Sequence, residues 1–431
     1  MSRRDSRSPR HRERDLDRYY KSAKTYHPYN NHQRNRHYKD EHTRYRRDYS
    51  PSPQSNHRDY YRKDDYQSRR SHRDRNARRS YECTKTSSRQ EQERYKKYDD
   101  KEGHYEFKIN ETILDRCMFL FNLVDVINSF MGEGTFARVV RCLDLKYNKH
   151  VAIKIVRSVP KYTESAKIEV DILKDVAEHD QKDKYHCIRL ISHFTYRNHM
   201  CLVFPLYGPS LYDRIKSTGY TGFSIHQVRI MTYELVRAVH YMHSRLNLVH
   251  TDLKPENILT NNEHDHSIKV IDFGSATYNN QRHASIISTR HYRAPEVILD
   301  EGWSYPADMW SVGCIMIELF TGDAVFQTHE NREHLALMEA VLGPIPKSCV
   351  PKANMEQSKY FLNDRLDWPH IASSRDSIEF VQQTHTLQML CENHQDMYDL
   401  ARRLLSYRPE ERMTAKQALQ HHFFSSLHKM D

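Results

Sequence analysis

The strongest constraint on the fold of this chain is the uneven distribution of its apolar residues. Residues 1–100 contain one leucine, Leu16, and no valine, isoleucine, phenylalanine or tryptophan. Such a segment cannot bury enough apolar surface to offset its conformational entropy. We therefore predict a disordered tail over residues 1–115. Ordered structure is expected to begin near Leu120, and the remaining chain of about 330 residues is long enough for a sizeable core.

The net charge is concentrated in the same tail. The chain has 67 lysines and arginines and 57 aspartates and glutamates, a net charge of +10. Residues 1–100 hold 29 of the basic and 16 of the acidic residues, a balance of +13, which leaves a balance of −3 for the remainder. Basic runs of this kind are usually solvated or directed at other proteins.

The tail also pairs serine with arginine and with proline, for example at Ser68-Arg69 and Ser50-Pro51. These pairs indicate a phosphorylatable interaction segment or a nuclear-targeting segment. The alternative is a tail that only keeps the protein soluble. Thirteen tyrosines among residues 1–100 interleave with arginines, so direct RNA binding by base stacking is a further alternative. This alternative is disfavoured, because runs of charged residues are usually solvated or bind other proteins.

Several classes of protein are disfavoured by what the chain lacks. It has no run of about 18 uninterrupted apolar residues, so we expect no membrane span. Its first fifteen residues are polar and charged, which argues against a secretory signal peptide. The eight cysteines are scattered without a C-x-x-C pair. We expect reduced, buried thiols of a cytosolic or nuclear protein, not a disulfide framework or a zinc site.

Apolar periodicity predicts the order of the structural elements. Five short runs are typical of β-strands, at 122–131, 136–145, 150–156, 188–195 and 200–206. The first three predict an antiparallel meander. A helix is expected over 163–178 with Thr163 as its N-cap, and helical periodicity prevails after Pro209, most clearly over 226–245. The fold class is therefore α+β, with a small β-rich part before a larger helical part.

A glycine-rich turn lies between the first two predicted strands. Residues 132–139 read Gly-Glu-Gly-Thr-Phe-Ala-Arg-Val, and such glycines let backbone N–H groups approach a phosphate. A dinucleotide-binding turn would open a helix, whereas Val139 begins another strand. Taken alone, the motif also fits a structural β-turn. After such a turn Lys154 can reach the phosphates of a nucleotide, provided that an acidic partner, Glu169 on the following helix, fixes its position.

Two further motifs follow the long helix. Residues 250–257 read His-Thr-Asp-Leu-Lys-Pro-Glu-Asn, and residues 269–274 read Lys-Val-Ile-Asp-Phe-Gly. Phosphoryl transfer needs a carboxylate beside the acceptor hydroxyl, here Asp252, and an Asn and an Asp to hold Mg²⁺, here Asn257 and Asp272. Nearby Lys254 can neutralise the transferred group. Each motif alone could arise by chance, but their order and setting make a chance match a poor explanation.

On these motifs the chain resembles a eukaryotic protein kinase from about Val124 to Phe424. Ala-Pro-Glu at 294–296 matches the end of the activation segment, and Arg412 resembles the arginine that pairs with its glutamate, Glu296. The resemblance implies a two-lobed kinase fold, with an N-lobe over about 124–207, containing one key helix, and a mostly helical C-lobe over about 208–424. It implies ATP and Mg²⁺ as cofactors.

The resemblance also assigns roles to individual residues. The catalytic residues that it implies are Asp252, Lys254, Asn257, Lys154 and Glu169, and the metal ligands are Asn257 and Asp272. Phe204 is expected to be the gatekeeper, and residues 205–207 the hinge. The implied ATP-binding residues are Met131, Gly132, Glu133, Gly134, Thr135, Phe136, Ala137, Arg138, Val139, Ala152, Lys154, Phe204, Pro205 and Tyr207. Ala137 stands where the family has a third glycine.

A narrower resemblance rests on residues 333–339, Glu-His-Leu-Ala-Leu-Met-Glu. They are similar to the signature of LAMMER-type (cdc-like) kinases, with Leu337 in place of methionine and Ala340 where the family has arginine. The likeness implies a dual-specificity enzyme that phosphorylates Ser/Arg-rich splicing factors, phosphorylates itself and regulates splicing. It also implies a nuclear location, with the cytoplasm as a further possibility, and a monomer.

Three alternatives to an active kinase of this type make different demands on the sequence. A pseudokinase is expected to have lost one of four residues, all of which are present: Lys154, Asp252, Asn257 and Asp272. An RNA-binding protein is expected to carry a nucleic-acid motif in its ordered part, and none is found. A dual-specificity tyrosine-regulated kinase carries a Y-x-Y pair in the activation segment, whereas Tyr278 and Tyr292 lie fourteen residues apart.

One substitution predicts how the activation segment is ordered. Many kinases use an arginine before the catalytic aspartate to bind a phosphate on this segment. Thr251 occupies that position and cannot form such a pair. We therefore expect the segment to be ordered by its own contacts, without phosphorylation.

Overall fold

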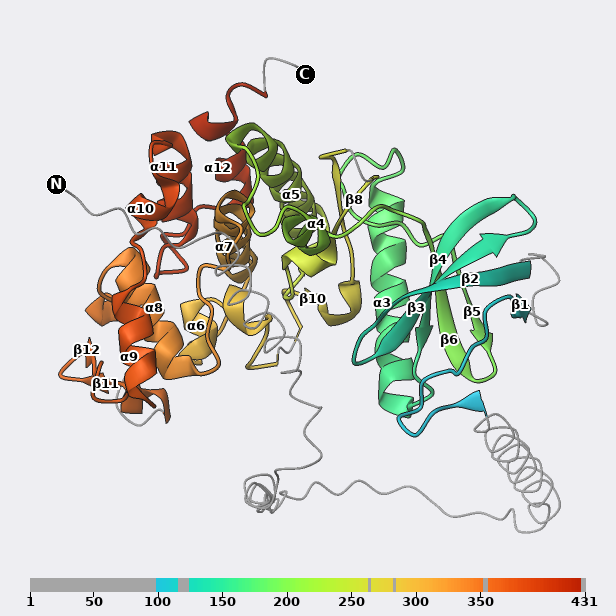
Figure 1. Cartoon of the computed structure of the whole chain (residues 1–431), viewed down its shortest axis with the longest axis horizontal. Coiled ribbons are helices and arrows are strands. Elements are labelled where there is room, and N and C mark those ends of the chain that lie inside the picture. The colour runs from blue at the N-terminus through green and yellow to red at the C-terminus, as the bar shows by residue number, and fades with distance from the viewer. Residues whose placement is uncertain (1–97, 115–123, 263–264, 282–283, 352–355, 428–431) are drawn as a thin grey trace, which may run out of the picture. The chain divides into compact units, whose positions relative to one another are not determined.

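The structure is a computed structural model that describes residues 98–427, except 115–123, 263–264, 282–283 and 352–355 (Figure 1). All described residues belong to one of the two compact units of the chain, residues 86–431. The other unit, residues 1–85, lies outside the described residues, and so does the predicted tail as far as residue 97.

The N-terminal lobe is built on a six-stranded antiparallel sheet of order β1-β2-β3-β4-β6-β5. Its strands are β1 (Thr112–Leu114), β2 (Val124–Glu133), β3 (Ala137–Asp144), β4 (Lys149–Val156), β5 (Ser192–Tyr196) and β6 (His199–Pro205). The antiparallel pairing of β2, β3 and β4 confirms the predicted meander. Side chains alternate along β4: Val151, Ile153 and Ile155 are buried in a core on one face, so Lys154 points to the other face.

α3 (Pro160–His179) packs on the face of the sheet to which Lys154 points. The prediction of Thr163 as its N-cap is wrong, because the helix begins at Pro160 after Val159. Proline suits the first helical position, since its fixed φ is helical and its missing N–H needs no partner there. The Thr163 hydroxyl donates to the carbonyl of Val159 at 3.3 Å. Glu169 lies on the buried side of α3.

Ordered structure begins earlier than expected. Residues 98–111, which we call the N-terminal strap, precede β1 and pack on the sheet. Tyr105 is 1% exposed and lies in the core on the face opposite α3. His199 donates to Asp99 at 2.9 Å, and Arg138 forms an ion pair with Asp100 at 2.8 Å. The expected start near residue 120 and the expected tail boundary at 115 are therefore too late.

The C-terminal lobe is mostly helical. Its α-helices are α4 (Leu211–Ser217), α5 (Ile225–Arg245), α6 (Pro295–Ile298), α7 (Pro306–Thr321), α8 (Asn331–Leu342), α9 (Arg375–Gln382), α10 (Leu387–Cys391), α11 (Gln395–Leu404) and α12 (Ala415–Leu419). α5 confirms the helix expected over 226–245, and the hydroxyl of Ser224 caps it by accepting from the N–H of Gln227. In the described ranges, no helix is both long and apolar enough to cross a bilayer.

Two buried apolar clusters form the core. One lies in the N-terminal lobe between the sheet and the N-terminal strap. The other runs from the α3 side of the sheet through the C-terminal lobe, where α7 is buried along most of its length. Of the six described cysteines, all free thiols, five are buried, as expected for reduced protein: Cys142, Cys187, Cys201, Cys314 and Cys391.

Short strand pairs bring the two later motifs together. β7 (Leu248–Val249) pairs with β10 (Thr277–Tyr278), and β8 (Ile258–Thr260) pairs with β9 (Ile268–Val270). A third pair, β11 (Phe361–Leu362) and β12 (Arg365–Leu366), lies beyond α8. The 250–257 motif connects β7 to β8 through the turn η2 (Pro255–Asn257), and the 269–274 motif leaves β9 for the turn η3 (Phe273–Ser275). The N–H of Ile271 donates to the carbonyl of Asn257 at 2.9 Å, which aligns the two loops.

Candidate active site

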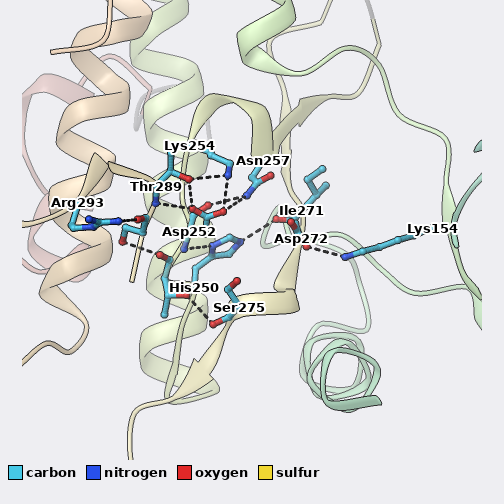
Figure 2. A network of polar contacts seen from close by, with 12 residues as sticks. Lys154, His250, Asp252, Lys254, Asn257, Ile271, Asp272, Ser275, Thr289 and Arg293 are labelled. Atoms are coloured by element: carbon cyan, nitrogen blue, oxygen red, sulfur yellow. Dashed lines mark hydrogen bonds and ion pairs between the residues drawn. The ribbon is translucent and has the colours of Figure 1, made fainter. Parts of the chain in front are cut away.

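Three charged side chains from three elements meet between the lobes. The Lys154 ammonium of β4 donates to both carboxylate oxygens of Glu169 on α3, at 2.8 and 3.0 Å, and to Oδ1 of Asp272 at 2.9 Å. This contact confirms the predicted pairing of Lys154 with Glu169. Figure 2 shows Lys154 extended toward Asp272. The lysine thus joins the sheet, α3 and the loop after β9 in one ion-pair network.

The network shifts the pKa values of its members. The positive charge of Lys154 lowers the pKa of Asp272 to about 2, although burial opposes this. Burial would lower the pKa of Lys154, but the charges of Asp272 and Glu169 outweigh it and raise that pKa. Lys154 and Asp272 are therefore firmly ionised at neutral pH. Burial raises the pKa of Glu169, although the charge of Lys154 opposes this shift.

The geometry of the loop after β9 explains its glycine. Asp272 has a left-handed backbone, with φ of 63°, which turns its side chain toward Lys154. A Cβ at Gly274 would lie 3.3 Å from Oδ1 of Asp272 and 3.4 Å from Oε2 of Glu169. Any larger residue would crowd both carboxylates, so glycine at this position keeps the cluster compact.

The carboxylate of Asp252, the third in the site, is held by three neighbours. Its Oδ2 accepts from the Lys254 ammonium at 2.7 Å and from the Asn257 amide at 3.3 Å. Its Oδ1 accepts from the backbone N–H and the hydroxyl of Thr289, at 3.0 and 2.7 Å (Figure 2). The side chain is one-fifth exposed, so it is oriented from several sides and still open to an incoming group.

Buried Asp308 at the start of α7 supports the loop that carries Asp252. Its oxygens accept from the backbone N–H groups of His250 and Thr251, at 2.8 and 3.0 Å, and from the His243 ring at 2.9 Å. Burial would raise the pKa of Asp308, but these donors outweigh it and lower the pKa. A stable buried carboxylate thus holds Thr251 in its left-handed conformation, with φ of 68°.

The glycine-rich turn lies at the end of the β2–β3 hairpin. It closes by a hydrogen bond from the N–H of Gly134 to the carbonyl of Ala137, at 2.9 Å. A Cβ at Gly132 would meet nothing within 4 Å, so packing does not explain this glycine. Met131 and Phe136 beside it are about half exposed. Open space next to a glycine backbone is what a closely approaching phosphate requires.

The other residues predicted to bind ATP lie on the adjoining strands and at their end. Ala152 of β4 is paired with Phe204 of β6, so the two residues lie side by side on neighbouring strands. β4 is also the strand that carries Lys154. Pro205 ends β6, and Tyr207 follows it, half-buried against the larger core. Arg138 forms an ion pair with Glu133 across the β2–β3 hairpin, at 2.6 Å, and a second one with Asp100 of the N-terminal strap.

Oxygen atoms remain available for a metal ion. Within the described part of the chain, Oδ2 of Asp272 and Oδ1 of Asn257 take part in no hydrogen bond, since Lys154 uses only Oδ1 of Asp272 and Asn257 donates through its amide nitrogen. A carboxylate and an amide oxygen are ligands that suit Mg²⁺. The residues present therefore fit a hard divalent cation.

The activation segment is held by contacts among its own residues and the loop of Asp252. The Thr251 hydroxyl donates to the carbonyl of Ser275 at 2.8 Å, and the Ser288 hydroxyl donates to the carbonyl of Thr251 at 2.8 Å. Arg293 donates to the carbonyls of Ile287 and Ser288, both at 2.8 Å. These contacts support the expectation that Thr251 replaces phosphate-dependent ordering.

Treatment of the purified chain with phosphatase is accordingly expected to reduce its rate on a protein substrate by less than about tenfold, because no ordering contact named above needs a phosphate. The rate is measured before and after treatment. The companion variant Thr251→Val removes the hydroxyl contact with Ser275 and keeps the side-chain shape, so it should slow the untreated enzyme. An enzyme that phosphatase inactivates and self-phosphorylation restores would contradict this expectation.

Sequence reasoning missed several residues of the site. Thr289, which binds Asp252 directly, and Asp308, which supports the loop, were not among the predicted site residues. The N-terminal strap was missed altogether, although Tyr105, Phe107 and Ile109 alternate with polar residues as in a strand. That alternation was the available signal for it. No local pattern indicates the partner of Thr289, because the contact spans 37 residues of sequence.

Fold and site together define a protein kinase. The family model described as protein kinase domain matches residues 126–424. A solved crystal structure of a kinase domain is 38% identical to this chain with a TM-score of 0.69, covering 75% of this chain and all of that one. These findings confirm the two-lobed fold. A protein kinase of this kind uses ATP with a divalent metal and acts on proteins.

Two relatives specify the group further. The serine/threonine-protein kinase AFC1 of Arabidopsis thaliana is 45% identical over 358 residues, which cover 76% of this chain and 74% of AFC1. The dual specificity protein kinase CLK2 of Homo sapiens is 41% identical over 351 residues, covering 76% of this chain and 68% of CLK2. The chain belongs to the LAMMER-type (cdc-like) family of protein kinases.

Proposed function

We propose that the chain transfers the γ-phosphoryl group of ATP, bound with Mg²⁺, to serine and threonine hydroxyls, and also to tyrosine, in Ser/Arg-rich splicing factors. The observation that carries this proposal is the position of Asp252. Its carboxylate is fixed by Lys254, Asn257 and Thr289, and it stays open to an acceptor hydroxyl. Bound ATP and Mg²⁺ supply the phosphoryl donor and the neutralisation of its charge.

In this proposal Lys154 positions the α- and β-phosphates, and Glu169 positions Lys154. The present contacts of Lys154 with two carboxylates support this role, because they hold its ammonium on the α3 face of the sheet, on the strand next to the one that follows the glycine-rich turn. Residues 131–139 cover the phosphates with their backbone. Pro205 offers only a carbonyl, which suits acceptance from the adenine amino group, and Tyr207 offers a backbone N–H, which suits donation to an adenine ring nitrogen.

Asp252 orients the acceptor hydroxyl and accepts its proton. Lys254 lies 2.7 Å from Oδ2 of Asp252, a distance from which its ammonium also reaches the transferred group. Asn257 and Asp272 hold the metal ion through the oxygens that no hydrogen bond uses. Burial would lower the pKa of Lys254, but the charge of Asp252 outweighs it and raises that pKa, so Lys254 stays cationic at neutral pH.

The substrate class and the nuclear location rest on the family and on the tail. Relatives of the chain are named dual specificity protein kinases, CLK2 and lkh1 among them. The tail has a charge balance of +13, which suits nuclear import and retention among Ser/Arg-rich proteins. Its own Ser–Arg pairs resemble the proposed substrate class, so we expect the enzyme to phosphorylate its tail.

This proposal is tested with full-length enzyme, ATP and Mg²⁺ on Arg/Ser, basic and acidic peptides, and with a chain that lacks residues 1–97. The deletion stops at 97 because the N-terminal strap is part of the folded lobe. We expect preference for Arg/Ser peptides, unchanged peptide turnover after deletion, and loss of nuclear retention. A preference for acidic peptides would contradict the substrate class, and a truncated enzyme that stays nuclear would contradict the role of the tail.

A further inference from the structure

Arg157 directly follows β4 and contacts both the N-terminal strap and the glycine-rich turn. Its Nη1 donates to the carbonyl of Thr135 in the turn at 2.8 Å. Its Nε and Nη2 donate to the carbonyl of Glu102 in the strap, the first at 2.8 Å. Its own backbone N–H donates to the carbonyl of Phe136 at 3.0 Å. One residue therefore binds two consecutive carbonyls of the turn and one carbonyl of the strap.

The Arg157 side chain is also enclosed by its neighbours, with 14% of it exposed. Its guanidinium carbon lies 5.2 Å from the centre of the Tyr162 ring, in the first turn of α3. The Phe136 ring of the turn meets the same tyrosine edge-on, with 5.1 Å between the ring centres. The carboxylate of Glu102 is exposed and lies 3.8 Å away, so this ion pair contributes little. Arg157 thus acts mainly through backbone carbonyls.

The contact with Thr135 determines where one N–H of the turn points. In a planar trans peptide, the C=O of one residue and the N–H of the next point in opposite directions. The carbonyl of Thr135 faces Arg157, so the N–H of Phe136 faces the other way. In the part of the chain that the structure describes, this N–H donates to no acceptor. It is therefore a donor held in a fixed direction and free for a ligand.

The turn has little packing of its own to fix that direction. A Cβ at Gly132 would meet nothing within 4 Å, and a Cβ at Gly134 would meet only the carbonyl of Ala137, at 4.0 Å. Glycines with open space around them leave the backbone many conformations. The orientation of the turn therefore depends on the contacts of Arg157 to a large extent.

The strap presents its carbonyl to Arg157 from an ordered turn. The N–H of Gly103 donates to the carbonyl of Asp100 at 3.1 Å, and Oδ1 of Asp100 accepts from the N–H of Glu102 at 2.9 Å. The N–H of Ser158, next to Arg157, donates to the carbonyl of Gly103 at 2.9 Å. The strap is thus a firm support on one side of Arg157, with the glycine-rich turn on the other.

We propose that Arg157 is a positioning residue for ATP: it orients a peptide of the glycine-rich turn whose N–H binds a phosphate oxygen, and it anchors that peptide to the N-terminal strap. Backbone N–H groups of such turns suit phosphate oxygens. Arginine suits this position because its rigid fork carries five N–H donors, so one side chain binds the strap and the turn together. The identity of the ligand as ATP rests on the proposed function, whereas the anchoring of the turn does not.

The test uses the full chain with Arg157→Met or Arg157→Lys. Methionine keeps the apolar contact with Tyr162 and removes every donor, and lysine keeps the charge without the fork. The matched control is Arg375→Met, a highly exposed arginine on α9. Calorimetry measures binding of a non-hydrolysable ATP analogue and of adenosine, which lacks phosphates. Kinetics on an Arg/Ser peptide give KM for ATP, and hydrogen exchange follows the amides of residues 132–137.

We expect Arg157→Met to weaken binding of the analogue and to raise KM for ATP by about tenfold, the scale of one hydrogen bond to a charged group. Arg157→Lys should lose less. Adenosine should bind all three proteins equally, the turn amides should exchange faster in Arg157→Met, and Arg375→Met should match the wild type. Equal losses of adenosine and analogue binding would show general damage to the lobe and would overturn the positioning role.

The part played by the strap is tested at Gly103, which has φ of 85°. A Cβ there would lie 3.3 Å from Cγ2 of Val159, so Gly103→Val displaces the strap from Arg157. The control Gly302→Val places the same strain, at φ of 83°, in open space. We expect Gly103→Val to weaken analogue binding alone and to add nothing to Arg157→Met. Effects that multiply would show that the strap does not act through Arg157.

The outcomes separate this inference from the proposed function. If the wild type phosphorylates Arg/Ser peptides and Arg157→Met binds the analogue as tightly as the wild type, the inference is wrong and the proposed function stands. If the wild type binds no ATP analogue, the proposed function is wrong. Amide exchange then decides the anchoring: faster exchange of the turn in Arg157→Met supports it, and unchanged exchange overturns it.

Discussion

Replacing Asp252 with asparagine is expected to lower kcat by about 10²–10⁴-fold, the usual contribution of a general base. Asparagine keeps the size of the side chain and can still accept from Thr289 through its carbonyl oxygen, but it cannot take the proton of the acceptor hydroxyl. ATP affinity should be unchanged, because the phosphate contacts come from Lys154 and the glycine-rich turn. Steady-state kinetics on an Arg/Ser peptide and binding of an ATP analogue measure the two effects.

The matched control is Asp376→Asn, an exposed aspartate in the first turn of α9, which should leave both values unchanged. Because Asp252→Asn also weakens the ion pair with Lys254, thermal unfolding of the variant is compared with that of the wild type. A folded variant with near-normal kcat would remove Asp252 from the proposed role.

The second large effect concerns stability. Arg412→Ala is expected to lower the free energy of unfolding by about 3–5 kcal/mol, because it leaves the buried carboxylate of Glu296 without its partner. Arg412 donates to both oxygens of Glu296, at 2.6 and 2.9 Å, and its side chain is fully buried. It also donates to the carbonyls of Ser406 and Pro306. Urea unfolding measures the change.

Two comparisons make this prediction specific. Arg403→Ala removes an exposed arginine that pairs with Asp399 on α11 and should cost at most about 1 kcal/mol. Adding Glu296→Gln to Arg412→Ala removes the unpaired charge and should recover part of the loss. An Arg412→Ala variant as stable as the wild type would show that the buried pair contributes little.

Local pattern was sufficient for much of the fold. The alternation in β4 determines that Lys154 faces away from Ile153 and Ile155, and the helical spacing in α3 places Glu169 on the buried side. Each of these two patterns is confined to a single segment. Because only a short connection joins β4 to α3, the side chains of Lys154 and Glu169 lie on facing surfaces. The pairing of Lys154 with Glu169 could therefore be predicted, as could the strands that flank the glycine-rich turn.

The start of the folded unit could not be placed in this way. The N-terminal strap contains few apolar residues, and its stability depends on distant partners: Asp99 binds His199, and Asp100 binds Arg138. Its many charged residues resemble those of the tail, and Phe107 and Ile109 are its only large apolar residues of types that residues 1–100 lack. Only the sheet, once formed, offers the surface that buries Tyr105.

What the sequence determined by itself was the chemistry available: a lysine after a glycine-rich turn, two carboxylates and an asparagine in ordered motifs. Periodicity also determined the strands and helices that carry them. Only the tertiary structure decided that Lys154 joins Asp272 as well as Glu169, that Thr289 holds Asp252, and that Asp308 supports the loop of Asp252. The physical reason is the distance along the sequence. Strand and helix patterns involve residues only a few positions apart, whereas these contacts close loops of 37 to 118 residues. Such contacts form only when many weak interactions across the whole core stabilise the same arrangement.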